Sequence, residues 1–297
     1  MAPATVLVMG ATGAIGSALV DKLLPDHRKG LLRLVVTTRR PDAADRLRKE
    51  GVDVRRLDLD EAETGGLQAV RPAFAGVDRL MLITGYDVRM LAQSKAAVDA
   101  AKAEGVSYVT HVGVSATEDT TIVHFAWHQL VEAYIERSSL RYTHLRPAAF
   151  MQNLRLSVTA PGVLRHFVGE ARPNWVDVTD IAEVAATVLC DPEPHAGRAY
   201  DLASESASLR EITELLGKAT GRPWRYEPAE PQAFYESMVA AGADPVYMAC
   251  VRNVFERTRN GSLDEPDDIF TTIEAVTGRP ATSMQEFVRR NHDLFSG

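Results

Sequence analysis

The chain has 297 residues, of which 45% are hydrophobic and 25% are charged, which excludes a disordered protein and allows one large domain or two lobes. The net charge of −7 and the pI near 5.7 argue against nucleic acid or an anionic membrane as the main partner. Cys190 and Cys250 provide neither a disulfide framework nor a metal-binding spacing, and no apolar run is long enough for a membrane span or a signal peptide. We therefore expect a soluble cytoplasmic protein.

Apolar runs alternate with helical patterns through the first half of the chain. Strands are expected at residues 5–9, 32–38, 53–57, 79–83, 108–112 and 141–145. Helices are expected at residues 14–24, 42–50, 88–104 and 124–137, with a short helical turn at 64–70. Repeated β-α units of this length predict an α/β fold with a doubly wound parallel sheet, the Rossmann fold. Ligands of such sheets bind beyond the carboxyl ends of the strands, so the loops there are the expected site.

The first strand runs into three glycines, Gly10, Gly13 and Gly16, with the spacing GxxGxxG. Glycine permits a sharp turn against which a phosphate can lie, and the following helix offers free N–H groups and its positive dipole end. Gly16 would let this helix approach the sheet closely. The turn predicts a pyrophosphate site, and the alternative is a structural turn without a ligand.

The second strand ends in Arg39 and Arg40, where an acidic residue would bind the adenosine ribose of NAD. A guanidinium matches a 2′-phosphate better than a bare hydroxyl. We predict NADP as the cofactor, with NADPH preferred over NADH, resting on Arg39 first and Arg40 second. The alternative is that these arginines are ordinary solvated residues.

Three further strand ends carry candidate residues. Asp58 could accept from the adenine amine while Leu59 packs against the ring, or Asp58 could cap the next helix. Thr84 and Gly85 follow the fourth strand where the ribose and nicotinamide would pass, although Gly85 could be an ordinary turn. The fifth strand leads to Ser115, whose hydroxyl would lie at the mouth of the expected cleft.

Segments from nearly the whole chain resemble the NmrA-like branch of the atypical short-chain dehydrogenases. They are GATGAIG (10–16), TTRRP (37–41), LDLD (57–60), HVGVSA (111–116), LRYTHLRPAAFMQNL (140–154), VDVTDIAEVAATVL (176–189), HAGRAYDLAS (195–204) and VTGRPATSMQEFVRRN (276–291). This group includes NADPH-dependent quinone and triphenylmethane-dye reductases and redox-sensing regulators that bind NADP. The resemblance implies cofactor contacts at Gly10, Thr12, Gly13, Ala14, Ile15, Arg39, Asp58, Leu59, Thr84 and Gly85.

The chain departs from the wider group where a Tyr and a Lys four residues later would protonate a carbonyl oxygen. It has His124 and His128 there, and many close relatives carry Lys at the second position. His124, His128 and Glu132 share one helix face, so His128 could hold the nicotinamide ribose or donate a proton, with Glu132 orienting it. The alternative is that both histidines are half-buried and satisfied by neighbours. We expect no metal, because the glutamate of HExxH is absent.

The chain beyond the sixth strand, which Pro147 ends, is expected to cover the cofactor and bind substrate. Residues 150–154 should close over the nicotinamide end, with contacts from Phe150 and Asn153. Residues 176–189 predict a short strand and a helix that starts at Thr179 or Asp180, and residues 198–202 predict another strand. Ser208 and Glu211 form a capping box that opens a helix to residue 219, which residues 221–223 end.

Two domains are expected. Residues 1–150 should bind the dinucleotide, joined by the returning segment 176–203, and residues 151–297 should form a smaller C-terminal α/β substrate lobe. Aromatic and thioether side chains enrich the last third, most of them expected in the core and some along the cleft: Trp224, Tyr226, Phe234, Tyr235, Met238, Tyr247, Met248 and Phe255. Such side chains adapt to flat apolar molecules, so we expect a planar aromatic or conjugated small-molecule substrate.

Two classes of function fit this pattern. The first is an NADPH-dependent reductase that transfers a hydride to a quinone, enone or imine without a Tyr-Lys pair. Its catalytic candidates are His128, His124 and Ser115, any of which needs only to donate a hydrogen bond to the developing anion. The second is an NADP-binding redox sensor, or a non-redox protein such as a cyclase or isomerase. The pattern favours no particular oligomeric state.

Overall fold

The computed structural model describes residues 2–40, 44–263 and 269–295, which form two compact units. Unit 1 comprises Met1–Gly113, Trp127–Arg146 and Ile181–Tyr200. Unit 2 comprises Val114–Ala126, Pro147–Asp180 and Asp201–Gly297. Each unit has a buried apolar core of its own.

Unit 1 is built on a parallel sheet. Its strands are β1 (Ala4–Val8), β2 (Leu32–Thr38), β3 (Asp53–Arg56), β4 (Arg79–Ile83), β5 (Tyr108–Val112), β6 (Arg141–Pro147) and β11 (Arg198–Leu202). In the part of the chain that the structure describes, these seven strands lie in the order β11-β6-β5-β4-β1-β2-β3. β1 pairs in parallel with β2 on one side and with β4 on the other, so the strand order reverses between β1 and β4. A reversal of this kind opens a ligand-binding crevice at the carboxyl ends of the strands.

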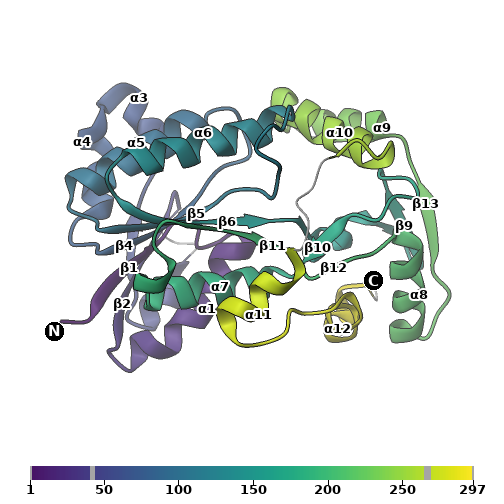
Figure 1. Ribbon diagram of the computed structural model, residues 1–297, viewed down its shortest axis with the longest axis horizontal. Helices are drawn as coiled ribbons and strands as arrows, with labels where there is room; N and C mark the ends of the chain where they lie inside the picture. The colour runs from purple at the N-terminus through teal and green to yellow at the C-terminus, as the bar shows by residue number, and fades with distance from the viewer. Residues whose placement is uncertain (1, 41–43, 264–268, 296–297) are drawn as a thin grey trace. The chain divides into compact units, whose positions relative to one another are not determined.

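Helices cover both faces of this sheet, with α5 and α6 on one face and α1 and α7 on the other (Figure 1). The helices are α1 (Ala14–Arg28), α2 (Asp45–Lys49), α3 (Ala62–Gly65), α4 (Leu67–Val70), α5 (Met90–Ala103), α6 (Val123–Arg137) and α7 (Val178–Cys190). Short 3₁₀ turns lie at Leu59–Glu61, Arg71–Phe74 and Glu193–His195. This arrangement confirms the predicted doubly wound fold.

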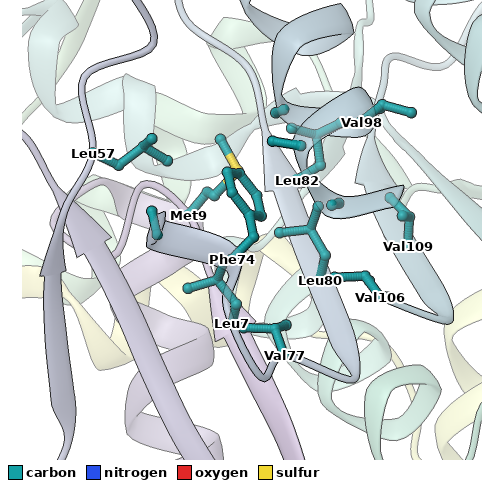
Figure 2. Close-up of a cluster of buried hydrophobic side chains, with 14 of the residues drawn as sticks. Leu7, Met9, Leu57, Phe74, Val77, Leu80, Leu82, Val98, Val106 and Val109 are labelled. Carbon is teal, nitrogen blue, oxygen red and sulfur yellow. The ribbon is translucent and has the colours of Figure 1, made fainter. Parts of the chain in front are cut away.

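Burial on both faces explains why the strands read as continuous apolar runs. Val6, Leu7 and Val8 are all fully buried although they point alternately to opposite faces. On the face under α5 and α6, Leu7 packs with Phe74 and the other side chains labelled in Figure 2. This packing holds the strand ends in place.

The predicted strands are confirmed to within two residues, and the helices differ at their ends. α1 continues past the expected end at Leu24 through Pro25 to Arg28, and the N–H of its C-cap residue Lys29 donates to the Pro25 carbonyl oxygen at 3.2 Å. The predicted turn at 64–70 consists of α3 and α4, separated by Gly66 with a φ of +62°. The expected helix start at residue 42 lies outside the described residues.

The expected start of α7 at Thr179 or Asp180 is wrong, because Asp177 caps the helix. One oxygen of its carboxylate, Oδ1, accepts hydrogen bonds from the Thr179 N–H and hydroxyl, each at 2.8 Å. The capping box of Ser208 and Glu211 is confirmed, and Gly221 ends that helix with a φ of +69°.

Unit 2 is a smaller α/β structure. Its strands are β7 (Ala149–Phe150), β8 (Val158–Ala160), β9 (Val163–His166), β10 (Asn174–Val176), β12 (Glu205–Ser206) and β13 (Arg225–Pro228). Within the described residues they form two three-stranded sheets, β12-β10-β7 and β13-β9-β8. Its helices are α8 (Leu209–Thr220), α9 (Pro231–Ala240), α10 (Pro245–Arg259), α11 (Thr272–Thr277) and α12 (Met284–Arg290), with 3₁₀ turns at Met151–Ser157, Ile269–Thr271 and His292–Phe295.

The core of unit 2 surrounds Trp175, whose indole N–H donates to the carbonyl oxygen of Ala207 at 2.9 Å. The buried indole thus has its polar atom satisfied. No helix among the residues that the structure describes is both long enough and apolar enough to cross a bilayer.

The close approach of α1 to the loop after β1 depends on Gly16. A Cβ at this position would lie 2.6 Å from the carbonyl carbon of Gly10 and 2.9 Å from the Cα of Ala11. Real Cβ atoms do not approach backbone so closely, so any side chain at this position would force α1 away from β1.

We expect Gly16→Ala to lower the free energy of unfolding by about 2 kcal/mol or more, because the backbone around the added methyl group must move. Gly217→Ala is the matched control, since its Cβ would lie 3.6 Å from its nearest neighbour, the oxygen of Arg222. That change in a helix should be neutral or stabilise by about 0.5–1 kcal/mol. Urea unfolding measures both, and equal effects would contradict the packing described for Gly16.

Candidate functional site

The loop after β1 and the end of β4 meet where the strand order reverses. Gly10 has a φ of +64°, and a Cβ built on it would lie 3.6 Å from the Cβ of Ile83, the last residue of β4. The Gly13 N–H donates to the Gly10 carbonyl oxygen at 2.9 Å and closes the turn. Thr84 and Gly85 follow Ile83 directly, so the structure brings the glycine loop next to the other predicted nucleotide segment.

The start of α1 is open to an anion. Gly10, Thr12, Gly13 and Ala14 are exposed, whereas Ile15 is buried and anchors the first turn. Gly13 is the N-cap residue and has no side chain to satisfy the first N–H groups of the helix, and the first turn has no acidic residue. Free N–H groups and the positive dipole end therefore face solvent together, as a phosphate group requires.

Arg39 and Arg40 lie at the end of β2, the neighbour of β1, and both are exposed. The Arg40 N–H donates to the Thr38 hydroxyl at 3.1 Å, which turns the chain at the strand end. Within the described ranges no carboxylate pairs with either guanidinium, whereas Arg46 pairs with Asp21 at 3.0 Å in the same unit. The two guanidiniums follow the strand next to the glycine loop, and both are accessible to an anionic ligand.

Asp58 acts as a cap, one of the two roles considered for it. Its Oδ1 accepts from the Asp60 N–H at 3.2 Å, and Leu59 is half-buried against the core under α5. Asp60, which was not singled out from the sequence, accepts from Gln93 Nε2 at 2.6 Å and from Arg89 Nη1 at 2.8 Å.

Gln93 also limits the space at Gly85, because a Cβ on Gly85 would lie 3.4 Å from Gln93 Oε1. Asp60, which follows β3, and Gly85, which follows β4, therefore both lie next to Gln93 of α5. No local sequence pattern predicts these contacts.

Ser115 belongs to unit 2 and is buried. Its hydroxyl donates to Asp201 Oδ1 at 2.9 Å, and its N–H donates to the Pro147 carbonyl oxygen at 3.1 Å. Sequence reasoning missed Asp201, because the two residues are 86 positions apart and only the fold brings them together. The hydroxyl is thereby held by an acceptor.

His124 also belongs to unit 2, where its ring packs against Phe125 and Tyr247 with centroids 4.7 and 5.4 Å apart. Burial lowers the pKa of His124 to about 4. The imidazole is therefore uncharged at neutral pH.

His128 and Glu132 are buried in unit 1, and with His124 they form the buried face of α6 that their spacing predicts. The His128 ring lies 5.9 Å from the ring of His111 on β5. Glu132 is the counter-ion of Arg146: Arg146 Nη2 donates to Oε2 at 2.5 Å, and Nε lies 3.1 and 3.2 Å from the two carboxylate oxygens. The carboxylate that was expected to orient His128 therefore has its charge compensated by a guanidinium at the end of β6.

Residues 150–154, which were expected to close over the nicotinamide, are partly accessible to solvent and partly buried in the core of unit 2. Phe150 is half-buried and Asn153 is exposed, but Met151 and Leu154 are completely buried in the core of unit 2. The expectation is therefore wrong for Met151 and Leu154, which anchor the segment. Gln152 donates to Asp177 Oδ1 at 2.8 Å and accepts from the Val178 N–H at 3.0 Å.

Aromatic side chains of unit 2 form a cluster of half-buried rings, here called the aromatic cluster: His166, Phe167, Phe234 and Phe255. The Phe167 ring lies 5.3 Å from Phe234 and 5.5 Å from Phe255, and His166 lies 5.4 Å from Phe255. Of the eight aromatic and thioether residues noted in the last third, only Tyr247 and Met248 are buried. Trp224, Tyr226 and Phe255 pack against the core of unit 2, which confirms that most of the eight belong to the core, whereas Phe234, Tyr235 and Met238 are half-buried.

Comparison with known proteins gives a consistent family. Residues 3–287 match the model of the NmrA-like family. The chain is similar to an NAD(P)H azoreductase of Xenophilus azovorans, with 29% identity over 98% of this chain and 99% of that protein. It is equally similar, at 29% identity over 98% of this chain and 99% of that protein, to the (4-alkanoyl-5-oxo-2,5-dihydrofuran-3-yl)methyl phosphate reductase of Streptomyces griseus.

A solved structure of Citrobacter sp. triphenylmethane reductase complexed with NADP(H) superposes on the fold with a TM-score of 0.79. It is 25% identical in sequence, over 96% of this chain and 99% of that one.

The buried imidazole of His124 predicts acid sensitivity. Histidine in an unfolded chain has a pKa near 6.5, so the folded state, with a pKa of about 4, binds fewer protons. This contribution to stability is complete above pH 6.5 and is lost as the pH falls toward 4, by about 3 kcal/mol. Between pH 7 and pH 4 the wild type should lose about that much more free energy of unfolding than His124→Phe, measured with urea.

The exposed His292, replaced by Phe in the same way, serves as the control and should keep the wild-type pH dependence. If His124→Phe and the wild type respond identically to acid, the imidazole is not held uncharged by the fold.

Proposed function

The chain belongs to the NmrA-like family, and from that premise we propose that it is a reductase that uses NADPH to transfer a hydride to a flat conjugated small molecule. The observation that carries the proposal is the pair of exposed guanidiniums, Arg39 and Arg40, without carboxylate partners among the described residues, on the strand next to an open glycine loop. The names of the three relatives, all reductases, agree with this class of chemistry.

In this proposal each part of NADPH has residues that fit it. The backbone from Gly10 to Ile15 binds the pyrophosphate, because the positions that approach it closely lack a Cβ or are exposed. Arg39 and Arg40 bind the 2′-phosphate, which a planar guanidinium recognises with paired hydrogen bonds. Asp58, whose Oδ1 caps the next turn, is proposed to accept from the adenine amine with its other carboxylate oxygen, and Leu59 is proposed to pack against the ring. Thr84 and Gly85 lie along the path to the nicotinamide.

The residues next to the substrate need only to donate hydrogen bonds. NADPH supplies the hydride, and a conjugated acceptor spreads the resulting negative charge, so the strong acid of a Tyr-Lys pair is unnecessary. We assign the donor role to His128. The Ser115 hydroxyl donates its one hydrogen to Asp201 Oδ1, so Ser115 is proposed to donate to the anion only by exchanging that hydrogen bond for one to the substrate. His124 is uncharged at neutral pH and is assigned no acid role. Phe150 and Asn153 are proposed to contact the nicotinamide end.

The aromatic cluster supports a flat substrate of quinone, enone or imine class. Half-buried phenyl rings such as Phe167, Phe234 and Phe255 offer faces and edges on which a conjugated molecule can stack. An azo group, an oxo-dihydrofuran and a triphenylmethane, the groups in the relatives' names, all carry unsaturated or aromatic systems. Both observations support a flat, conjugated small molecule as the substrate.

A second candidate function is an NADP-binding sensor, or a non-redox enzyme such as a cyclase or isomerase. The absence of a tyrosine at position 124 favours it, since ordinary ketone reduction in this fold depends on that phenol. In this alternative the protein binds the nucleotide at the same site but transfers no hydride.

Deuterium transfer distinguishes the two functions. The purified chain is incubated with NADPH carrying deuterium at C4, prepared as each of the two stereoisomers, together with a panel of quinones, enones and imines. We expect deuterium in the product of at least one acceptor from one stereoisomer, detected by mass spectrometry. Tight NADPH binding with no transfer to any acceptor would instead support the sensor or non-redox function.

Loss of Arg39 should weaken NADPH selectively. A hydrogen bond between charged groups contributes about 1.5–3 kcal/mol, so Arg39→Ala should raise the Kd for NADPH about tenfold to a hundredfold and leave that for NADH unchanged. Arg40→Ala should act in the same direction with a smaller effect. Nicotinamide fluorescence measures both constants.

Arg46→Ala removes an exposed guanidinium of the same unit that already pairs with Asp21, and should leave both constants at their wild-type values. An equal loss of NADPH and NADH affinity in Arg39→Ala would contradict the 2′-phosphate assignment.

A further inference from the structure

Three buried side chains of unit 1 converge although they come from three different elements. His111 lies on β5, His144 on β6 and Glu132 on α6, and all three are at most 4% exposed. His111 and His144 are direct neighbours in the parallel register of β5 and β6, so their rings project from the same face of the sheet. A nitrogen of each ring and a carboxylate oxygen of Glu132 all lie within 4.8 Å of one another.

The two imidazoles are buried without hydrogen bonds. Among the described residues, neither ring nitrogen of His111 and neither ring nitrogen of His144 has a partner within hydrogen-bond distance. Outside the cluster, Glu136 Oε1 lies 3.6 Å from His144 Nε2. Leaving a polar group buried and unsatisfied costs about 1–3 kcal/mol, so a ligand that bonds to these ring nitrogens would remove that cost.

The donor atoms define the kind of ligand. Two imidazole nitrogens with one carboxylate oxygen suit Zn²⁺ and its first-row neighbours, whereas Ca²⁺ and Mg²⁺ prefer oxygen ligands throughout. Metal binding requires uncharged imidazole. Burial, aided by neighbouring positive charge, lowers the pKa of His111 well below its ordinary value and that of His144 to about 3, so both rings are uncharged at neutral pH.

We propose that His111, His144 and Glu132 bind one divalent transition-metal ion, with Zn²⁺ as the reference ion, inside unit 1. The site is separate from hydride transfer and does not rest on the proposed function. It was invisible in the sequence, because strand register and helix packing, rather than a local spacing, bring positions 111, 132 and 144 together.

Gly113 leaves the room that this geometry needs. A Cβ at Gly113 would lie 2.7 Å from Glu132 Oε1 and 3.4 Å from Cε1 of His111, so any side chain there would displace the carboxylate. Arg146 acts in the opposite sense, because its guanidinium pairs with Glu132 and repels a cation. We therefore expect weaker binding than the same three ligands would give alone, and slow entry because every ligand is buried.

Metal loading tests the proposal directly. The full chain is stripped with a chelator, incubated for hours with Zn²⁺ or Co²⁺, and passed through a desalting column. We expect one ion per chain by elemental analysis, visible d–d absorption bands from Co²⁺, and a Zn²⁺-dependent rise in Tm. None of these measurements depends on NADPH or on turnover.

Two buried variants separate ligation from folding. His111→Leu and His144→Leu each remove a ligand and two unsatisfied nitrogens, so the metal-free variants should be at least as stable as the metal-free wild type. Both should bind Zn²⁺ at least about tenfold more weakly and lose the Tm shift. His292→Leu, which removes an exposed histidine beside Asp293, is the control and should keep both.

Two results would overturn the proposal. One is the absence of bound Zn²⁺ and Co²⁺ after loading, which would show that water or packing alone occupies the cluster. The other is binding that survives in His111→Leu and His144→Leu but disappears in His292→Leu, which would assign the ion to the surface.

Discussion

The contact on which unit 1 depends is the approach of α1 to the loop between β1 and Gly16. Gly16 has no Cβ, so the first turn of α1 can lie against the backbone of Gly10 and Ala11. This contact aims the N–H groups of the helix start at the point where β1 and β4 part, and places them beside the end of β2. The parallel pairing of β1 with β2 and β4 brings the glycine loop, Thr84 and the two arginines to one edge of the sheet, and the contact at Gly16 brings the helix start to the same edge.

The fold could be predicted from the sequence because each strand, helix and cap is specified by residues that are close together in the chain. Strands buried on both faces are continuous apolar runs, and the capping box of Ser208 and Glu211 is contained in four residues. The alternation of strand and helix then restricts the sheet to a parallel, doubly wound arrangement.

The site was harder to predict, because its chemistry is set by pairings across long distances in the chain. Ser115 was identified, but its acceptor Asp201 was not, and Glu132 was identified without its guanidinium partner Arg146. The helical spacing placed His124 on one face of α6, but it carries no information on how deeply the ring is buried, and burial is what lowers its pKa. The side chains of Arg39 and Arg40, by contrast, need only to follow β2 and remain exposed, so the sequence sufficed to find them.

The candidate nucleotide-binding residues and most of the candidate substrate-binding residues belong to different units. All the candidates for the pyrophosphate, the 2′-phosphate and the adenine belong to unit 1 and lie at the strand ends of its parallel sheet. Ser115, Phe150, Asn153 and the aromatic cluster belong to unit 2, whose sheets are short.

The most direct test of the central claim is a calorimetric titration of the wild-type chain with 2′,5′-ADP and with 5′-AMP, which differ only in the 2′-phosphate. If the arginines at the end of β2 bind that phosphate beside the glycine loop, 2′,5′-ADP binds at one site per chain and at least about tenfold more tightly than 5′-AMP. Equal affinity for the two nucleotides, or no binding of either, would contradict the account.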